Sequence, residues 1–570
     1  MGMGCMRLST DDDRDEERAF ETIAAAAEAG IVVFDTARAY GHGSTELGHN
    51  ERLLASALRR CRAKASARIV TKGGMSRAGG GWVPDGRAGT ILRDCEASLV
   101  ALGGLDIDLY LLHAPDPRTS WRTSVRALAR LVDDGVVQRV GVSNVNLGRL
   151  DEALDIAPIC AVQVPLSVYD DRALRGGLVE RCEQSGVALM AHSPLGGPRK
   201  AAGLARREEL SKIAAARGAT AAEVALAWLL QLSPVVIPIP GARRRETALS
   251  VARAATLRLT DEERSTLTRT FGGLRPTGIE RPRTPDAAEV VLIMGIPGAG
   301  KTQLAHDYVA RGYTRLNRDE RGGSLRTLAV ALDKELASDP RSIVLDNTYL
   351  TRAARSYVLD AARRHGLATH CIWLDTPLAQ AQINLVERLI DRFGALPSPE
   401  ELQILAQREE GIVAPTSQMR AVRELEPPAT DEGWDDVERV PFVRAPLTRS
   451  EAGAVLVAAA AMARPGSTTA IAEANPAAPH LIFDWDPGGS VASLAAVADQ
   501  LVQEVTGTVE TALCPHEGGP PRCWCRPPLP GLPLAFARAH QVDVFRSTVI
   551  GCRPAHRTLA EAMGARYVNV

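Results

Sequence analysis

The sequence predicts an α/β protein of three parts: a (β/α)8 TIM barrel, then an α/β domain with a parallel sheet, then a small α/β domain. Strand-like apolar runs alternate with helical patterns eight times before residue 273, as expected for a barrel of eight βα units. A stretch rich in Gly, Pro and Arg follows without periodicity and is typical of a linker. The predicted boundaries are 1–273 for the barrel, 274–288 for the linker, 289–446 for the second domain and 447–570 for the third.

Composition places the chain among globular proteins. Of its 570 residues, 45% are hydrophobic and 24% are charged, and the formal net charge is −1. This balance excludes chain-wide disorder and gives no basic excess of the kind that a nucleic-acid coat protein needs. The longest apolar run, about 452–463, is too short to span a bilayer, and the N-terminus has no signal-like apolar region. We therefore expect a cytoplasmic protein with no membrane partner.

Polar residues stand at the C-terminal ends of the predicted barrel strands. The eight strands are Gly4–Ser9, Ile31–Asp35, Arg68–Lys72, Ile107–His113, Val137–Ser143, Ile159–Val164, Val187–Ser193 and Val235–Pro240. The polar residues at their ends are Asp35, Lys72, His113, Ser143, Gln163 and His192. Because the active site of such a barrel forms at this face, the set is a candidate site. Any one of them alone could equally be a satisfied polar residue at a strand end.

Together these residues suit the reduction of a carbonyl group. That reaction needs a proton donor beside the substrate oxygen, and Tyr40 follows Asp35 by five residues. A phenol with a pKa near 10 needs help to donate a proton at neutral pH. We expect a Lys72 ammonium, held by Asp35, to lower the pKa of Tyr40, and His113 to orient the carbonyl.

The motifs around these residues are similar to those of the aldo-keto reductases. The matching stretches are Val33–Gly41, Val70–Lys72, Leu111–His113, Gly141–Asn144, Val162–Gln163, Ala191–Leu195 and Ile237–Gly241, which cover the whole first segment. The resemblance implies a catalytic tetrad of Asp35, Tyr40, Lys72 and His113 acting on a small-molecule carbonyl substrate. It also implies that Ser143, Asn144 and Gln163 hold the nicotinamide carboxamide, that His192 stacks on its ring, and that Arg243, Arg244 and Arg245 bind a 2′-phosphate. The expected cofactor is NADPH, because guanidinium groups suit phosphate geometry.

A glycine-rich loop opens the second domain. The buried-strand run Val290–Met294 leads into Gly295-Ile296-Pro297-Gly298-Ala299-Gly300-Lys301-Thr302, and a helical pattern follows from Gln303. This is the phosphate-binding motif in its strand–loop–helix context, in which Gly295, Gly298 and Gly300 let backbone N–H groups turn toward phosphates. Lys301 is expected to contact the β- and γ-phosphates of ATP, and Thr302 to ligate Mg²⁺.

The rest of this domain resembles the kinase domain of polynucleotide 5′-kinases. The similarity rests on Leu316-Asn317-Arg318-Asp319, on Ile343–Thr348, and on 352–365 and 375–392. It implies that Asp319 is the general base and that Arg392, or alternatively Arg388, clamps the transferring phosphoryl group. The implied acceptor is an RNA or DNA 5′-hydroxyl. Small-molecule kinases share these features, and the segment carries 19 Lys and Arg against 23 Asp and Glu, so a polynucleotide would have to bind a local basic patch.

Four of the ten cysteines crowd into the third domain. Cys514-Pro515-His516 and Cys523-Trp524-Cys525 give the pattern C-x-H-x6-C-x-C, whose ligand pairs Cys514, His516, Cys523 and Cys525 suit tetrahedral Zn²⁺. The phrase is similar to the zinc loop of haloacid-dehalogenase-type phosphatases that act on histidinol phosphate and heptose bisphosphate. That family has a Lys where Pro527 stands, and Mg²⁺-binding Asp residues where Cys552 and His556 stand. The one candidate for the nucleophilic motif, Asp484-Trp485-Asp486, lacks the Asp-Gly-Thr ending, so we expect a degenerate, inactive module.

Three functions remain open on these grounds. The leading one is a multidomain enzyme that combines NADPH-dependent carbonyl reduction with ATP-dependent phosphoryl transfer to a polynucleotide 5′-hydroxyl, as in nucleic-acid end healing. The first alternative is a small-molecule reductase and kinase acting on one carbonyl or polyol scaffold. The second makes the barrel an NADPH-sensing or oligomerising scaffold for the kinase, although a scaffold would not need an intact tetrad. The carbonyl substrate, the phosphoryl acceptor and the oligomeric state stay open.

Overall fold

The structure is a computed structural model of the whole chain. It describes residues 1–570 except 64–65, 79–80, 272–287, 339–340, 410, 430–431, 443–451 and 520. The chain divides into two compact units, Met1–Pro276 and Thr277–Val570. The predicted linker, 274–288, lies outside the described residues except for Ala288, as do the residues around the predicted boundary at 446.

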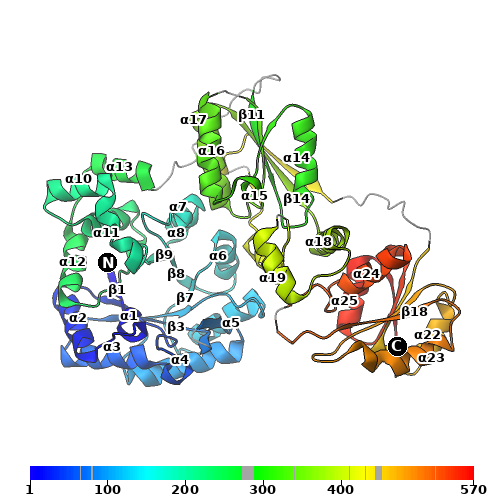
Figure 1. Cartoon of the computed structure of the whole chain (residues 1–570). Helices are drawn as coiled ribbons and strands as arrows, with labels where there is room; N and C mark the ends of the chain where they lie inside the picture. Colours follow the sequence, from blue (N-terminus) through cyan, green and yellow to red (C-terminus); the bar gives the residue numbers. More distant parts are fainter. Residues whose placement is uncertain are drawn as a thin grey trace. The chain divides into compact units, whose positions relative to one another are not determined.

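The first unit is the predicted barrel of eight parallel strands (Figure 1). In sheet order the strands are β1 (Gly2–Gly4), β2 (Val33–Asp35), β3 (Arg68–Gly73), β6 (Leu109–Leu112), β7 (Val140–Ser143), β8 (Ile159–Pro165), β9 (Ala188–His192) and β10 (Val236–Pro238). A parallel bridge between Gly4 and Gly241, with the Gly4 N–H donating to the Pro240 carbonyl at 3.0 Å, closes the barrel. The fold class predicted for this segment is confirmed.

The first strand lies earlier than predicted. We expected Gly4–Ser9, but the strand is Gly2–Gly4 and the following residues form the short helix α1 (Arg7–Thr10). A Cβ on Gly2 would come within 3.0 Å of the Ile239 side chain, and one on Gly4 within 3.0 Å of the Ile239 carbonyl. Glycine fits because the closing strand approaches so closely here. Because glycine has a low strand propensity, the sequence pattern did not indicate a strand at Gly2–Gly4.

Helices alternate with the barrel strands. They are α2 (Glu16–Glu28), α3 (His49–Arg60), α4 (Ala88–Leu102), α5 (Trp121–Asp133), α6 (Leu147–Leu154), α7 (Arg172–Arg175), α8 (Leu178–Ser185), α9 (Pro198–Ala201), α10 (Glu208–Arg217), α11 (Ala221–Leu232), α12 (Arg245–Thr256) and α13 (Asp261–Phe271). An antiparallel hairpin, β4 (Met75–Ala78) and β5 (Gly81–Pro84), follows β3 and was not predicted. In the described part of the chain no single helix is long and apolar enough to cross a membrane; α10 and α11 pass such a test only as a pair bent by 97°.

The second unit begins with a five-stranded parallel sheet. Its order is β12 (Thr314–Leu316), β13 (Ile343–Asp346), β11 (Glu289–Met294), β14 (Ala368–Asp375) and β15 (Asp436–Pro441). Around it lie α14 (Lys301–Ala310), α15 (Arg318–Arg321), α16 (Leu325–Ser338), α17 (Arg352–Arg364), α18 (Leu378–Phe393), α19 (Pro399–Arg408) and α20 (Pro415–Glu424). Both faces of the central strand are buried, because Val290 and Leu292 belong to one apolar cluster and Val291 and Ile293 to another.

A second five-stranded parallel sheet completes this unit. Its order is β18 (Val509–Cys514), β17 (His480–Trp485), β16 (Val455–Ala458), β19 (Thr548–Gly551) and β20 (Arg566–Asn569). The helices are α21 (Ala459–Met462), α22 (Ser467–Glu473), α23 (Ala495–Val502), α24 (Gly531–His540) and α25 (Pro554–Met563). Both α24 and α25 contact α18, so the two sheets of this unit are joined through that helix (Figure 1).

Candidate functional site

The predicted tetrad is assembled at the C-terminal ends of β2 and β3. Lys72 is 1% exposed, and its Nζ lies 2.8 Å from each carboxylate oxygen of Asp35 and 3.1 Å from the Tyr40 hydroxyl. The parallel register of β2 and β3 brings the strand ends together, and a turn closed by Tyr40 N–H to the Ala37 carbonyl directs the phenol back to them. The structure therefore brings together a buried ammonium, its counter-ion and a hydroxyl.

Charge on Lys72 is maintained despite burial. Burial by itself lowers the pKa of Lys72, but the Asp35 carboxylate and the Tyr40 hydroxyl outweigh it and raise the pKa above the ordinary value. The expectation for Tyr40 needs a correction. Lys72 does lower the pKa of Tyr40, as expected, but burial has the larger effect and the net pKa lies above the usual value for a phenol. The sequence showed the neighbouring charge but not the loss of solvent.

His113 lies against the phenol ring as a neutral imidazole. Its ring centroid is 5.7 Å from that of Tyr40. Burial, and then the Lys72 charge, hold the pKa of His113 well below its ordinary value. Its Nδ1 is buried and has no hydrogen-bond partner among the described residues. A neutral imidazole beside the phenol can bond to a substrate oxygen without adding charge.

Three of the residues expected at the nicotinamide form one hydrogen-bonded group. Asn144 follows β7 in the left-handed region (φ 58°) and donates from Nδ2 to Ser143 Oγ at 3.1 Å and to the His113 carbonyl at 3.0 Å. Its Oδ1 lies 3.1 Å from His192 Nε2, and burial lowers the pKa of His192 to about 4. Gln163 is placed differently, because its Nε2 donates to Asp35 Oδ1 at 2.7 Å and so joins the tetrad.

The three predicted phosphate-binding arginines are not equivalent. Arg243 pairs with Asp11 at 3.0 Å and with Asp13. Arg245, the first residue of α12, is 3.9 Å from Glu28. Arg244 caps the same helix, is exposed, and makes no side-chain hydrogen bond or ion pair within the described residues. Of the three arginines, Arg244 is therefore the one whose guanidinium is at a helix N-terminus and has no partner within the described residues.

Sequence reasoning missed Trp82. This residue comes from the β4–β5 hairpin, and its ring packs edge-on against Tyr40 with centroids 5.9 Å apart and lies 6.0 Å from His113. The Arg77 guanidinium lies 4.0 Å from its centroid. The indole is 41% exposed, so it borders the tetrad without sealing it. A tryptophan between Gly81 and Pro84 was visible in the sequence, but only the hairpin shows what it faces.

The phosphate-binding loop connects β11 to α14 as predicted. Lys301 Nζ donates to the Gly295 carbonyl at 2.9 Å and the Ile296 carbonyl at 3.0 Å, and burial lowers the pKa of Lys301 to about 8. At Gly298 a Cβ would lie 2.3 Å from the Ala381 carbonyl, so α18 approaches the loop too closely for any side chain. Thr302 is exposed in the first turn of α14. The backbone groups of residues 295–302 thus form a cradle, and the Lys301 ammonium lies inside it.

Two carboxylates near Lys301 have different surroundings. Asp346, at the end of β13, has a fully buried side chain that accepts from Arg315 Nε at 2.8 Å and from Asn317 Nδ2 at 3.1 Å. Asp319 lies in α15 with a 42% exposed side chain, and within the described residues that side chain pairs only with its neighbour Arg318, at 2.9 Å. Burial has the largest effect on the pKa of Lys301 and lowers it, while the charges of both carboxylates raise it. The accessible one, Asp319, is the one expected as general base.

The two lid arginines considered have different surroundings. Arg388 donates from Nη1 to the Gly411 carbonyl at 3.1 Å, and its charge adds to the effect of burial in lowering the pKa of Lys301. Arg392 lies one helical turn further along α18, is 44% exposed, and pairs with Glu409.

The four predicted metal ligands converge. The ligand atoms of Cys514, His516, Cys523 and Cys525 all lie within 4.8 Å of one another. Cys514 Sγ is 3.7 Å from Cys523 Sγ and 3.4 Å from Cys525 Sγ, and His516 Nδ1 is 3.2 Å from Cys525 Sγ. Zn–S bonds of about 2.3 Å in a tetrahedron separate sulfur atoms by roughly 3.8 Å, so the donor set fits zinc. In the described residues no other such cluster of three or more metal-ligand side chains occurs.

The residues considered for a phosphatase site lie at or near the strand ends of the third domain. The central strand β16 ends at Ala458 and runs into the alanines of α21. Asp484 lies on the neighbouring β17, where its Oδ1 accepts from the Trp485 N–H at 2.8 Å and lies 4.0 Å from Arg553. The Nδ1 of His556 accepts from the Cys552 N–H at 3.3 Å. The carboxylates of Asp484 and Asp486 lie on or directly after β17, and residues 447–570 contain no lysine.

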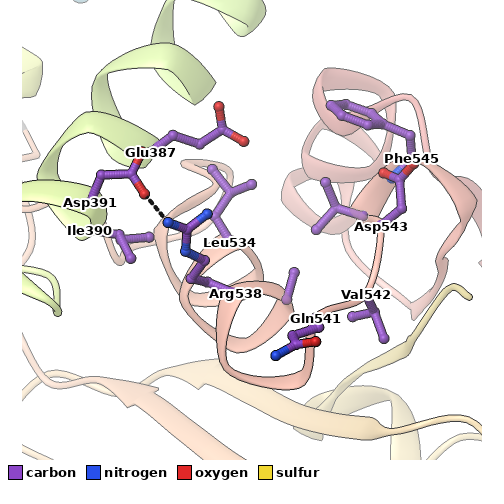
Figure 2. Close-up of a pocket in the computed structure, with 11 residues that line it drawn as sticks. Glu387, Ile390, Asp391, Leu534, Arg538, Gln541, Val542, Asp543 and Phe545 are labelled. Carbon is purple, nitrogen blue, oxygen red and sulfur yellow. Dashed lines mark hydrogen bonds and ion pairs between the residues drawn. The ribbon is translucent and has the colours of Figure 1, made fainter. Parts of the chain in front are cut away.

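A cavity of about 370 Å³ lies between α18 and α24. It is lined by Glu387, Ile390, Asp391, Leu534, Ala537, Arg538, Gln541, Val542, Asp543, Val544 and Phe545. Figure 2 shows Arg538 reaching from α24 to pair with Asp391 on α18. The cavity marks the seam at which the third domain packs on α18.

Comparison with known proteins assigns the first two segments. Residues 1–270 match the model of the aldo/keto reductase family, and residues 290–402 match that of an AAA domain. An uncharacterized oxidoreductase of Schizosaccharomyces pombe is 30% identical over 267 residues, covering 46% of this chain and 83% of that protein. The aldo-keto reductase str7 of Strobilurus tenacellus is 30% identical over 280 residues, covering 44% and 80%. An aldo/keto reductase of Klebsiella pneumoniae in complex with NADP and acetate is 28% identical, with 48% and 90% covered and a TM-score of 0.40. Through its N-terminal unit, the chain belongs to the aldo/keto reductase family.

Proposed function

We propose that the first domain reduces a small carbonyl compound with NADPH and that Tyr40 donates the proton. The observation that carries this is the buried contact of Lys72 with both Asp35 and the Tyr40 hydroxyl. NADPH, when bound, supplies the hydride. Tyr40 gives its proton to the substrate oxygen, the Lys72 ammonium stabilises the phenolate that is left, and neutral His113 bonds to the same oxygen.

Residues at the rim of the barrel fit the two ends of this cofactor. Ser143, Asn144 and His192 form a polar group beside the tetrad that can hold and face a nicotinamide ring. Arg244 stands at the N-terminus of α12, where the helix dipole and the guanidinium both favour a phosphate. That pairing supports NADPH over NADH.

We propose that the second domain transfers the ATP γ-phosphate to a hydroxyl group. Support comes from Lys301 inside the loop cradle with the accessible Asp319 carboxylate nearby. In this scheme Thr302 ligates Mg²⁺, Asp319 takes the acceptor proton, and Arg388, in preference to Arg392, faces the transferring group. A polynucleotide 5′-hydroxyl is the first candidate acceptor. The second candidate acceptor is a small polyol. The excess of acidic over basic residues in 289–446 favours it over a polynucleotide.

We propose that the Cys3His site holds one structural Zn²⁺ and that the third domain has no phosphatase activity. Three thiolates and an imidazole fill a tetrahedral site and leave no position for a reacting water. All ten cysteines are free thiols, and ligand thiols persist in a reducing compartment, which supports our proposal that the protein is cytoplasmic.

Two activity screens on the full-length protein test the enzymatic proposals separately. NADPH oxidation is followed over a panel of aldehydes and ketones, and labelled ATP is offered with 5′-hydroxyl RNA, 5′-hydroxyl DNA and small polyols. We expect turnover in both screens. NADPH binding without turnover of any carbonyl would favour a cofactor-sensing barrel. Phosphorylation of polyols but not of nucleic acid would select the small-molecule alternative.

A further inference from the structure

Residues 411–418, here called the bridging segment, connect the phosphate-binding loop to the third domain. The segment passes into the first turn of α20, where Gln418 donates from Nε2 to the Pro297 carbonyl at 3.1 Å. Pro297 lies within the phosphate-binding loop, and Gln418 is fully buried. At the other end of the segment, the Gly411 carbonyl accepts from Arg388. The bridging segment thus contacts both the phosphate-binding loop and Arg388.

Trp524 anchors the bridging segment on the third domain. Its indole Nε1 donates to the Val413 carbonyl at 3.1 Å, across 111 residues of sequence, and the residue is 2% exposed. Ile412 belongs to the same apolar core as Trp524. Only four residues lie between Val413 and Gln418, and one of them, Pro415, restricts the backbone. We therefore expect a shift of the indole to move Gln418 as well, because the backbone that connects Val413 to Gln418 is short and contains a proline.

The position of Trp524 is in turn set by the Cys3His loop. The indole lies between the ligand residues Cys523 and Cys525 in sequence. Behind it, the Gly531 N–H donates to the Trp524 carbonyl at 3.1 Å, and a Cβ on Gly531 would lie 2.5 Å from that oxygen. A metal that holds both cysteines therefore also fixes the backbone that carries the indole.

Helix α18 provides a second connection between the phosphate-binding loop and the third domain. Its Asn384 donates from Nδ2 to the Gly298 carbonyl at 2.8 Å. Other residues of α18, Ile383, Val386 and Ile390 among them, are part of the core of the third domain and not of the cores that flank β11. The pair Arg538–Asp391 adds a polar contact at this seam (Figure 2). The elements that line the phosphate-binding loop are therefore packed on the third domain.

We propose that Trp524 is a positioning residue for the nucleotide site: the metal-held Cys3His loop sets the bridging segment, and with it Gln418 against the phosphate-binding loop. The inference rests on the proposed ATP site and gives the third domain a role that needs no phosphatase chemistry. Zinc and nucleotide binding are then energetically coupled, and each strengthens the other.

The test compares three full-length, zinc-loaded proteins: wild type, Trp524→Phe and Trp485→Phe. Trp485 is the matched control, since its indole also donates to a carbonyl of this loop, that of His516 at 2.8 Å, but has no contact with the bridging segment among the described residues. Dissociation constants for Mg·ATP and for NADPH are measured by titration. We expect Trp524→Phe to weaken ATP binding by about fivefold, the effect of one neutral hydrogen bond, and Trp485→Phe to bind ATP as wild type does. NADPH affinity should be unchanged in all three.

Zinc removal supplies the coupling measurement. Chelation should weaken ATP binding in wild type but cause little further loss in Trp524→Phe, because the path is already broken there. Hydrogen exchange of residues 411–418, measured without nucleotide, should be faster in Trp524→Phe than in Trp485→Phe. Wild-type ATP affinity in Trp524→Phe, or equal losses on chelation in both proteins, would overturn the positioning role. A wild-type protein that binds no ATP would refute the proposed kinase site, and hydrogen exchange would then decide whether the mechanical connection exists.

Discussion

At the scale of single residues, the Asp35–Lys72–Tyr40 cluster shows how burial and charge compete. Lys72 keeps its proton because Asp35 and Tyr40 both stabilise the ammonium inside the barrel. Tyr40 is held neutral, since burial raises the pKa of its phenol more than Lys72 lowers it. The neutral Tyr40 phenol still holds the proton that it would donate. The neighbouring Lys72 ammonium would stabilise the negative charge left on the phenolate oxygen. Removing one partner of a buried ion pair costs about 3–5 kcal/mol, so Asp35 also matters for stability.

Tyr40→Phe should abolish proton donation and leave cofactor binding nearly intact. The change removes one hydroxyl and preserves the ring that packs against His113 and Trp82. We expect carbonyl reduction to fall by about 10²–10⁴-fold, the usual contribution of general acid catalysis. Turnover and NADPH affinity are measured on the same preparation. Retained turnover in Tyr40→Phe would remove this residue from the mechanism.

Asp319→Asn should impair phosphoryl transfer without loss of ATP affinity. The Asp319 side chain is exposed and, among the described residues, pairs only with Arg318, so we expect its substitution to leave the loop around Lys301 in place. A lost general base typically lowers the rate by ~10²–10⁴-fold. Lys301→Ala is the comparison, because it removes the cation from the cradle and should weaken both binding and turnover. Equal rates in wild type and Asp319→Asn would exclude Asp319 as the base.

At the scale of elements, α18 serves two structures at once. Residues Ala381 and Asn384 touch the phosphate-binding loop, while Val386 and Ile390 enter the core of the third domain. Sequence resemblance favoured Arg392 as the clamp. In the structure Arg392 pairs with Glu409, whereas Arg388 donates to the Gly411 carbonyl. Because the two arginines are four residues apart, they lie on the same side of α18, about one turn from each other along its axis.

Arg388→Ala should therefore reduce phosphoryl transfer more than Arg392→Ala. An arginine that faces the transferring group contributes about 10³-fold or more to the rate, whereas an exposed ion pair contributes little. The measurement is kcat with saturating ATP for both variants. A larger loss in Arg392→Ala would return the clamping role to that residue.

At the scale of the whole molecule, three parallel sheets carry three separate clusters of polar residues. Metal content tests the third. We expect about one zinc per chain, as for a single Cys3His site, and Cys523→Ser should lower it and destabilise the third domain. Elemental analysis and thermal unfolding measure the two effects. A folded protein without zinc would contradict the site.

The same domain should release no phosphate from 3′-phosphorylated ends or sugar phosphates. Its central strand ends in alanine at Ala458, and the carboxylates of Asp484 and Asp486 lie on or directly after the neighbouring strand β17. Phosphate release that Asp484→Asn abolishes would restore a working phosphatase and contradict the degenerate assignment.

Sequence alone determined the features that depend on residues close together in the chain. Alternating strand and helix periods predicted the barrel, one eight-residue motif located the phosphate-binding loop, and the spacing C-x-H-x6-C-x-C predicted four ligands that the structure brings within 4.8 Å. Tertiary structure alone decided the position of the first strand, the net pKa shift of Tyr40, the different partners of Arg388 and Arg392, and the contact of Trp524 with Val413. These depend on how much solvent is excluded and on which distant segments meet. Burial and long-range contact are properties of the packed chain, and no local pattern encodes them.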